Sequence, residues 1–232
     1  MLHAETVEAG TLALIRKLSS DPILANFVLV GGTALALQLG HRKSIDIDLF
    51  SRKPFAGPTI DEHLRNNYAT KQLTSADNSI TGYLSEVKAT LIAHQYDWIR
   101  RPENVEGIRM ASLDDIAAMK LNAVVGSGKR LKDFVDVYFL LEHRSMQEMT
   151  DAYLAKYPGV NASVARNALL YHKQIDFGVD MGLKEALKFA AVRERLVEAM
   201  VEPRKVFKMA ARPAEGKKAE EKKEGLGRKR GR

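Results

Sequence analysis

A buried strand, a glycine turn, a helix and an acidic strand follow one another within residues 27–51, and this order constrains the fold more than any other feature. The apolar run Phe27–Val30 ends at the turn Gly31–Thr33, which predicts a short strand closed by glycine. The threonine is a typical cap for the helix that we expect over 34–39, and Gly40 predicts its end. The segment is therefore expected to begin a sheet, with a helix between two of its strands.

The second strand is predicted from strict alternation of polar and apolar residues, namely Ser44, Ile45, Asp46, Ile47, Asp48 and Leu49. Asp46 and Asp48 lie two residues apart, so their carboxylates project from one face of the strand. Like charges at that spacing repel unless a cation lies between them, and Mg²⁺ prefers oxygen ligands. The glycine turn before a helix adds free N–H groups for phosphate oxygens. A D-x-D pair alone is most often a solvated face, but together with the turn it favours a nucleotide and metal site.

The rest of the chain divides into a β-rich part and a helical part. We expect early helices and strands over 5–19, 59–68, 71–94 and 108–111, with 71–94 forming a β-hairpin region. Ser112 has the pattern of a helix cap, and later helices are predicted over 112–125, 132–142, 145–156, 162–175 and 181–200. The predicted organisation is an α/β core over 1–111, a helical region over 112–211 and a disordered basic tail over 212–232.

The net charge of +7 is concentrated in that tail, where nine basic and four acidic residues leave only +2 for residues 1–211. The charge therefore predicts a solvated tail with salt-sensitive affinity for RNA rather than a nucleic-acid-binding domain. The chain has no cysteine, which excludes disulfides, zinc–thiolate sites and a cysteine nucleophile. Met1–Gly10 lacks the features of a signal peptide, and no apolar run is long enough for a membrane helix. We expect a cytoplasmic protein without a membrane partner.

The segment Gly31–Ser51, with the sequence GGTALALQLGHRKSIDIDLFS, resembles the first motif of the AbiEii/AbiGii toxin family. That family is nucleotidyltransferase-like and belongs to the DNA polymerase β superfamily. Asp115–Lys120 and Lys132–Asp136 resemble its later motifs, a lysine carried on a helix and a D-x-x-D pair before an apolar helix. The resemblance implies an α+β protein with the minimal nucleotidyltransferase fold. That fold is a short mixed sheet flanked by helices, here followed by a helical C-terminal region.

The resemblance also implies a site for an NTP substrate. The nucleotide-binding residues that we predict are Gly31, Gly32, Thr33, Arg42, Lys120 and Asp136. Asp46 and Asp48 would bind Mg²⁺ (or Mn²⁺) and, with Lys120, form the catalytic set. Positioning and charge neutralisation supply most of the catalysis in phosphoryl and nucleotidyl transfer, and these residue types suit that task.

Simpler interpretations of several residues stay open. Lys120 fits a surface lysine on an amphipathic helix equally well. Asp133 and Asp136 fit first-turn acids that the helix dipole favours. His41 and Arg42 precede the acidic strand, and they either contact phosphate or are loop residues that pair with the carboxylates of that strand.

The sequence departs from the superfamily at the third catalytic carboxylate, which lies on a neighbouring strand. The aligned position in the strand 87–92 is Thr90, which shares its polar face with Lys88, while Glu86 and Asp97 are out of phase. This leaves open a site with one metal, or one that binds nucleotide without turnover. The segment Gly126–Arg130 resembles a phosphate-binding loop, but it follows a helix, and we interpret it as a helix–helix turn.

The leading hypothesis is a nucleotidyltransferase-like toxin of a toxin–antitoxin or abortive-infection system. It would transfer a nucleotide from an NTP, with Mg²⁺, to a hydroxyl of RNA, such as a tRNA 3′ end, or of a protein, and a cognate antitoxin would restrain it. The alternative is a catalytically degenerate module that binds NTP or RNA and acts through a partner protein. A third hypothesis is an interaction protein built on the helical half, in which the aspartate pair is dispensable.

Overall fold

The computed structural model describes residues 1–178, 182–183 and 187–208. Its strands are β1 (Phe27–Val30), β2 (Ile47–Ser51), β3 (Thr70–Ala76), β4 (Ser79–Leu84), β5 (Val87–Ala93), β6 (Glu103–Val105) and β7 (Ile108–Met110). Its helices are the short 3-10 helix η1 (Ala4–Thr6), α1 (Ala9–Ser20), α2 (Gly31–Leu39), α3 (Gly57–Asn67), α4 (Leu113–Gly126), α5 (Leu131–Leu140), α6 (Met146–Lys156), α7 (Ala162–Leu170) and α8 (Phe189–Val201). The predicted tail over 212–232, and part of the helix predicted over 181–200, lie outside the described residues.

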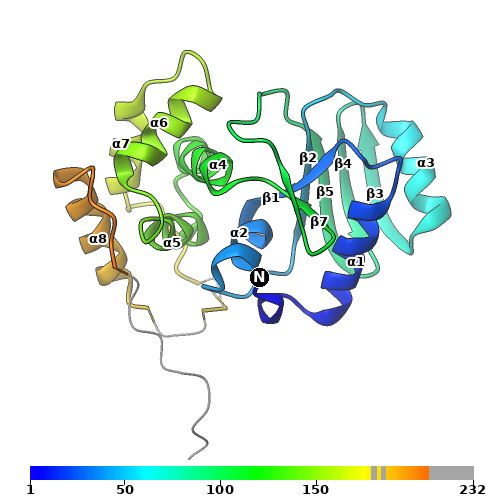
Figure 1. Ribbon diagram of the computed structural model, residues 1–232, viewed down its shortest axis with the longest axis horizontal. Helices are drawn as coiled ribbons and strands as arrows, with labels where there is room; N and C mark the ends of the chain where they lie inside the picture. Colours follow the sequence, from blue (N-terminus) through cyan, green and yellow to red (C-terminus); the bar gives the residue numbers. More distant parts are fainter. Residues whose placement is uncertain (179–181, 184–186, 209–232) are drawn as a thin grey trace, which may run out of the picture.

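The strands form one mixed sheet in the order β3-β4-β5-β2-β1-β7-β6. β1 runs antiparallel to β2 and parallel to β7, and β2 runs parallel to β5. Helices α1 and α3 lie toward one end of the molecule, and α5 to α8 gather at the other (Figure 1). No helix in the described part of the chain is long and apolar enough to cross a membrane. The expected α+β class, a short mixed sheet flanked by helices, is confirmed.

The two faces of the sheet differ because successive side chains alternate between them. One face carries buried aliphatic side chains, including Leu29, Leu49 and Leu91. They belong to the same core as Ile15 of α1 and Leu64 of α3, so this face is sealed from water. The opposite face carries Asp48, Phe50 and Thr90, which are only half-buried. The polar chemistry of the protein therefore lies on the face away from α1 and α3.

Several local predictions are confirmed. β1 forms over the predicted residues, and Gly40 ends α2 in the left-handed conformation, with φ 68°. The Ser112 side chain accepts a hydrogen bond from the Asp115 backbone N–H and caps α4. The β-hairpin region is also present, but it forms three antiparallel strands, β3 to β5.

The predicted starts of α2 and of β2 were both wrong, and the two errors have one cause. α2 begins directly at Gly31, and Thr33 lies inside the helix rather than at its cap. β1 therefore ends at Val30, whose pairing with Asp48 is the last between β1 and β2. The residues before β2 have no partner in β1, so Ile45 is 64% exposed instead of buried in the strand.

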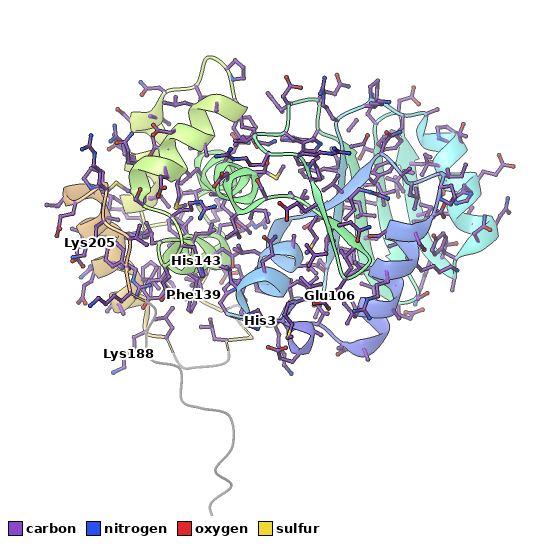
Figure 2. The ribbon with its side chains drawn as sticks, in the orientation of Figure 1. His3, Glu106, Phe139, His143, Lys188 and Lys205 are labelled. Atoms are coloured by element: carbon purple, nitrogen blue, oxygen red, sulfur yellow. The ribbon has the colours of Figure 1, made fainter. Side chains whose placement is uncertain are left out.

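The short hairpin of β6 and β7 holds the N-terminus. The Leu2 backbone N–H donates to Glu106 Oε1 at 2.9 Å, in the turn between the two strands, close to His3 (Figure 2). Only β7 was predicted, because the three residues of β6 are too few to show an alternating pattern.

Candidate functional site

A cavity of about 330 Å³ lies on the polar face of the sheet and is built by both halves of the chain. We call it the Asp48 cavity, and its lining includes Gly31, Asp48, Phe50, Lys120, Arg130 and Asp133. The sheet and the start of α2 supply the first three residues. The helices α4 and α5, and the turn between them, supply the others.

Gly31 gives Asp48 the space that it occupies. Its φ of 68° lies in the left-handed region, which favours glycine. A Cβ at this position would also lie 2.6 Å from Asp48 Oδ2. A Cβ on Gly32 would overlap the guanidinium of Arg42. The two glycines thus let a carboxylate and an arginine approach the start of α2, where helix N–H groups are free.

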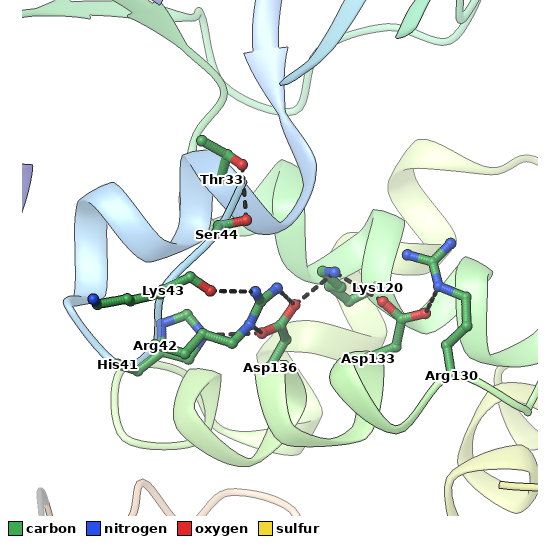
Figure 3. A network of polar contacts seen from close by, with 9 residues as sticks. All are labelled: Thr33, His41, Arg42, Lys43, Ser44, Lys120, Arg130, Asp133 and Asp136. Carbon is green, nitrogen blue, oxygen red and sulfur yellow. Dashed lines mark hydrogen bonds and ion pairs between the residues drawn. The ribbon is translucent and has the colours of Figure 1, made fainter. Parts of the chain in front are cut away.

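Thr33 holds the chain just before β2. Its buried hydroxyl donates to the backbone carbonyl of Asp46 and is hydrogen-bonded to Ser44 Oγ at 2.8 Å (Figure 3). The hydroxyl is thereby occupied by protein groups. Asp46 itself is exposed, and its backbone is fixed by this contact.

The charge on Asp48 is incompletely balanced by the protein. Burial raises the pKa of Asp48, the charge on Lys120 lowers it, and the charge on Asp46 raises it, with a net shift upward. A carboxylate pair in this state gains stability from a divalent cation, so the donor set fits Mg²⁺ or Mn²⁺. The described residues contain no cluster of three or more histidine or acidic ligands. Thr90 lies directly beside Asp48 in the sheet, so the position aligned with the third carboxylate offers only a hydroxyl.

A buried network of charges lies behind the cavity (Figure 3). Lys120 Nζ lies 2.8 Å from Asp133 Oδ1 and 2.6 Å from Asp136 Oδ2. Arg42 donates to both oxygens of Asp136, from Nε at 2.7 Å and from Nη2 at 3.0 Å. His41 Nε2 lies 2.8 Å from Asp136 Oδ1. The network ties the loop before β2 to α4 and α5.

Mutual attraction keeps Asp136, Lys120 and Arg42 ionised despite their burial. Burial raises the pKa of Asp136, but Lys120 and Arg42 outweigh it and hold that pKa well below its usual range. Burial lowers the pKa of Lys120, and Asp136 and Asp133 more than compensate, so the net shift is upward. For His41, burial outweighs the pull of Asp136 and lowers the pKa. The lysine that faces the cavity is therefore firmly protonated.

The structure gives the predicted residues different environments. The cavity is lined by Gly31, Asp48 and Lys120, but not by Gly32, Thr33, Arg42, Asp46 or Asp136. Lys120 is only 5% exposed and lines the cavity, so it is not a surface lysine. Arg42 and Asp136 are 3% and 0% exposed and bind each other, and neither lines the cavity. Arg42 thus pairs with Asp136 of α5 and not with the carboxylates of the acidic strand. Asp133, which sequence reasoning ranked below Asp136, does line the cavity.

Sequence reasoning missed an aromatic wall on the same cavity. His94 packs flat against Phe50, with ring centroids 5.0 Å apart, and Tyr157 Oη lies 3.2 Å from His94 Nε2. Burial and the charge on Lys156 lower the pKa of His94 to about 4, so its ring is neutral near pH 7. The alternation that singled out Asp48 extends to Phe50, but no sequence spacing links Phe50 to His94 and Tyr157.

The turn between α4 and α5 is the helix–helix connection that we expected over Gly126–Arg130. Arg130 Nε lies 3.2 Å from Asp133 Oδ2, and the side chain lines the Asp48 cavity. It therefore adds a second cation to the site beside Lys120.

Comparisons with known proteins show the family to which the chain belongs. The model of the nucleotidyl transferase AbiEii toxin family, of type IV toxin–antitoxin systems, matches residues 13–96 and 80–216. An uncharacterised protein of Aquifex aeolicus (strain VF5) is 31% identical over 163 residues, which are 68% of this chain and 79% of that protein.

Two solved structures share the fold of this chain. JHP933 from Helicobacter pylori superposes with a TM-score of 0.52 at 17% identity, over 84% of this chain and 92% of that one. An H. pylori protein described as a candidate nucleotidyltransferase gives a TM-score of 0.53 at 17% identity, over 86% and 92%. The family match spans most of the chain, and the protein belongs to the nucleotidyl transferase AbiEii toxin family.

Proposed function

We propose that this protein transfers a nucleotide from an NTP to a hydroxyl of RNA, such as a tRNA 3′ end, or of a protein. In this proposal it is the toxin of a type IV toxin–antitoxin pair, restrained by a cognate antitoxin. The observation that carries the proposal is that Asp48 and Lys120 face one cavity at the start of α2. The α/β core over 1–111 would supply the carboxylates, and the helical region over 112–211 would complete the site.

The predicted residues at the cavity and next to it would divide the tasks of such a transfer. Asp46 and Asp48 would hold Mg²⁺ (or Mn²⁺), which neutralises phosphate charge when bound. The N–H groups at Gly31 and Gly32 are placed to bind phosphate oxygens at the helix start. Lys120 stays protonated and would stabilise the negative charge on the departing pyrophosphate.

The buried residues around Lys120 are assigned to positioning. The carboxylate of Asp136 is fully engaged by Arg42, His41 and Lys120, so its proposed role is to position the lysine and not to contact the nucleotide. The proposed role of Thr33 is to position Asp46. Both assignments differ from direct nucleotide binding because these groups are already satisfied inside the protein.

Thr90 predicts a slow reaction. A positioned general base typically contributes about 10²–10⁴-fold to the rate, and no carboxylate stands at this position to receive the hydroxyl proton. The same observation favours the second candidate, a module that binds NTP or RNA without turnover and acts through a partner.

Incubation of the protein with α-labelled NTPs, Mg²⁺ and either total RNA or protein lysate tests the proposal. We expect label in an acceptor, and its loss in Asp48→Asn and Lys120→Met. Glu62→Gln, an exposed acid on α3, is the matched control and should retain transfer. Absence of transfer with every NTP and both acceptor pools would contradict the proposal. Calorimetric NTP binding without transfer would support the second candidate.

A further inference from the structure

A second cavity, of about 500 Å³, shares no lining residue with the Asp48 cavity. We call it the Trp98 groove, and its lining includes Val28, Arg52, Lys53, Trp98, Arg101 and Arg109. Four of these six side chains are cationic and one is a flat aromatic ring. No acidic side chain lines the groove among the residues that the structure describes.

The strand register places this groove next to the Asp48 cavity. Val28 pairs with Phe50, and Val30 pairs with Asp48. Paired residues project to the same face of a sheet, so Val28 and Asp48 share one face. Arg52 comes four positions after Asp48, which corresponds to about 13 Å along an extended strand. Phe50 lines the Asp48 cavity and stands between the two sites.

The groove keeps a net positive charge. The Arg109 guanidinium donates to backbone carbonyls, including those of Ser19 and Phe27 at 2.7 Å, and has no acidic partner in the described part of the chain. Arg52 pairs with Asp97 at 2.9 Å, but both side chains are more than half exposed, and such pairs are weak. Lys53 and Arg101 are exposed and have no acidic partner among the described residues.

Trp98 narrows the chemistry of the ligand. Its half-buried ring lines the groove, and Lys156 Nζ lies 4.7 Å from the ring centroid. Proteins bind single-stranded nucleic acid with cations that lie along its phosphate backbone and with aromatic rings on which its bases stack. An acidic peptide would use the cations but would leave the aromatic surface without a matching partner.

We propose that the Trp98 groove binds the single-stranded end of a polynucleotide and leads its terminal hydroxyl toward Asp48. The direction toward Asp48 rests on the proposed function. Binding in the groove requires neither NTP nor a metal ion, so it can be measured separately.

The chain contains one tryptophan, so its emission reports on this groove alone. The full chain is titrated, without NTP or Mg²⁺, with an end-labelled oligoribonucleotide of about 12 nucleotides. We expect quenching of Trp98 emission that follows the anisotropy of the label, and an affinity that falls with salt. A blunt duplex of the same sequence should bind more weakly and leave the emission unchanged.

Charge reversal tests the residues. Lys53→Glu with Arg101→Glu should weaken binding at least about tenfold and reduce the salt dependence. Arg193→Glu on α8, also an exposed arginine, is the matched control and should bind as the unaltered protein does. By anisotropy, Trp98→Phe should retain affinity and Trp98→Ala should lose about fivefold or more. Circular dichroism melting verifies that each variant is folded.

Three results would overturn the inference. One is anisotropy binding without any change in Trp98 emission, which would place the RNA elsewhere, for example on the basic residues of 212–232. The others are unchanged affinity in the double variant, and equally tight binding of polyglutamate.

The Asp48→Asn variant should keep the quenching. If RNA binds there while the unaltered protein transfers no nucleotide, the proposed function fails and this inference stands. If transfer occurs with an unaltered KM for RNA in the double variant, this inference fails alone.

Discussion

Arg42 and Asp136 form a bidentate ion pair in the interior, although they lie 94 positions apart in the chain. Neither side chain lines the Asp48 cavity, yet Asp136 also lies 2.6 Å from the ammonium of Lys120, which does. The pair therefore acts through the lysine. Its burial makes it sensitive to the loss of either partner, since a buried charge without its counter-ion is costly.

Asp136→Asn is expected to destabilise the protein by about 3–5 kcal/mol, because Arg42 and Lys120 would remain buried with less compensation. In a chain of this length that corresponds to a fall in melting midpoint of roughly 10 °C. Asp61→Asn removes an exposed i,i+4 pair with Arg65 and should cost no more than about 1 kcal/mol. Thermal melting of the two variants side by side measures the difference, and similar losses would argue against a special role for the network.

Gly31→Ala and Gly107→Ala separate backbone strain from displacement of the carboxylate. Both glycines have positive φ, 68° and 83°, so alanine should cost about 1–2 kcal/mol at each. A Cβ meets Asp48 Oδ2 at 2.6 Å from position 31 and meets nothing within 4 Å from position 107. We expect only Gly31→Ala to lose nucleotide transfer, by about 100-fold. Equal activity in the two variants would mean that Asp48 has room to move.

Thr90→Asp should create the missing ligand. Thr90 pairs with Asp48 on one side and with Thr81 on the other, so Thr81→Asp places the same charge one strand farther away. We expect Thr90→Asp to bind one more Mn²⁺ per chain than the unaltered protein, and Thr81→Asp to show no gain. Titration followed by electron paramagnetic resonance counts the ions. An unchanged stoichiometry in Thr90→Asp would show that this position cannot contribute a ligand.

His94 should make stability fall in weak acid. Burial and the charge on Lys156 lower its pKa from 6.5 to about 4, so between these values the unfolded chain binds more protons than the folded one. The stability from the neutral ring is complete above about pH 6.5 and declines as the pH falls toward 4. His94→Gln removes this dependence. Urea unfolding of both proteins from pH 7 to pH 4 should show the larger decline in the unaltered protein, and parallel declines would contradict the assignment.

The sequence pattern predicted the features that depend on interactions between residues close together in the chain. The strand Phe27–Val30, the end of α2 at Gly40 and the cap at Ser112 depend on neighbouring residues, and all three are present. The D-x-D spacing and the helix-borne lysine also singled out Asp48 and Lys120, which line one cavity, whereas Asp46 does not line it.

Contacts between residues far apart in the chain could not be predicted from the sequence pattern. Arg42 was expected to contact phosphate or to pair with the acidic strand, and its burial against Asp136 depends on a helix far away in the chain. The contact of His94 with Phe50 and Tyr157 depends in the same way on where β5 and α6 end in space. Ile45 was expected to be buried because alternation alone does not show where β1, its partner strand, stops.

The charge network behind the cavity also limits how the protein can move. A rotation of α4 and α5 against the sheet would have to separate the buried side chains of Arg42 and Asp136, and breaking a buried ion pair costs about 3–5 kcal/mol. The two walls of the cavity are thus rigidly joined at their base. A substrate would enter a preassembled slot, and its affinity would not be reduced by the free energy of closing one half of the protein onto the other.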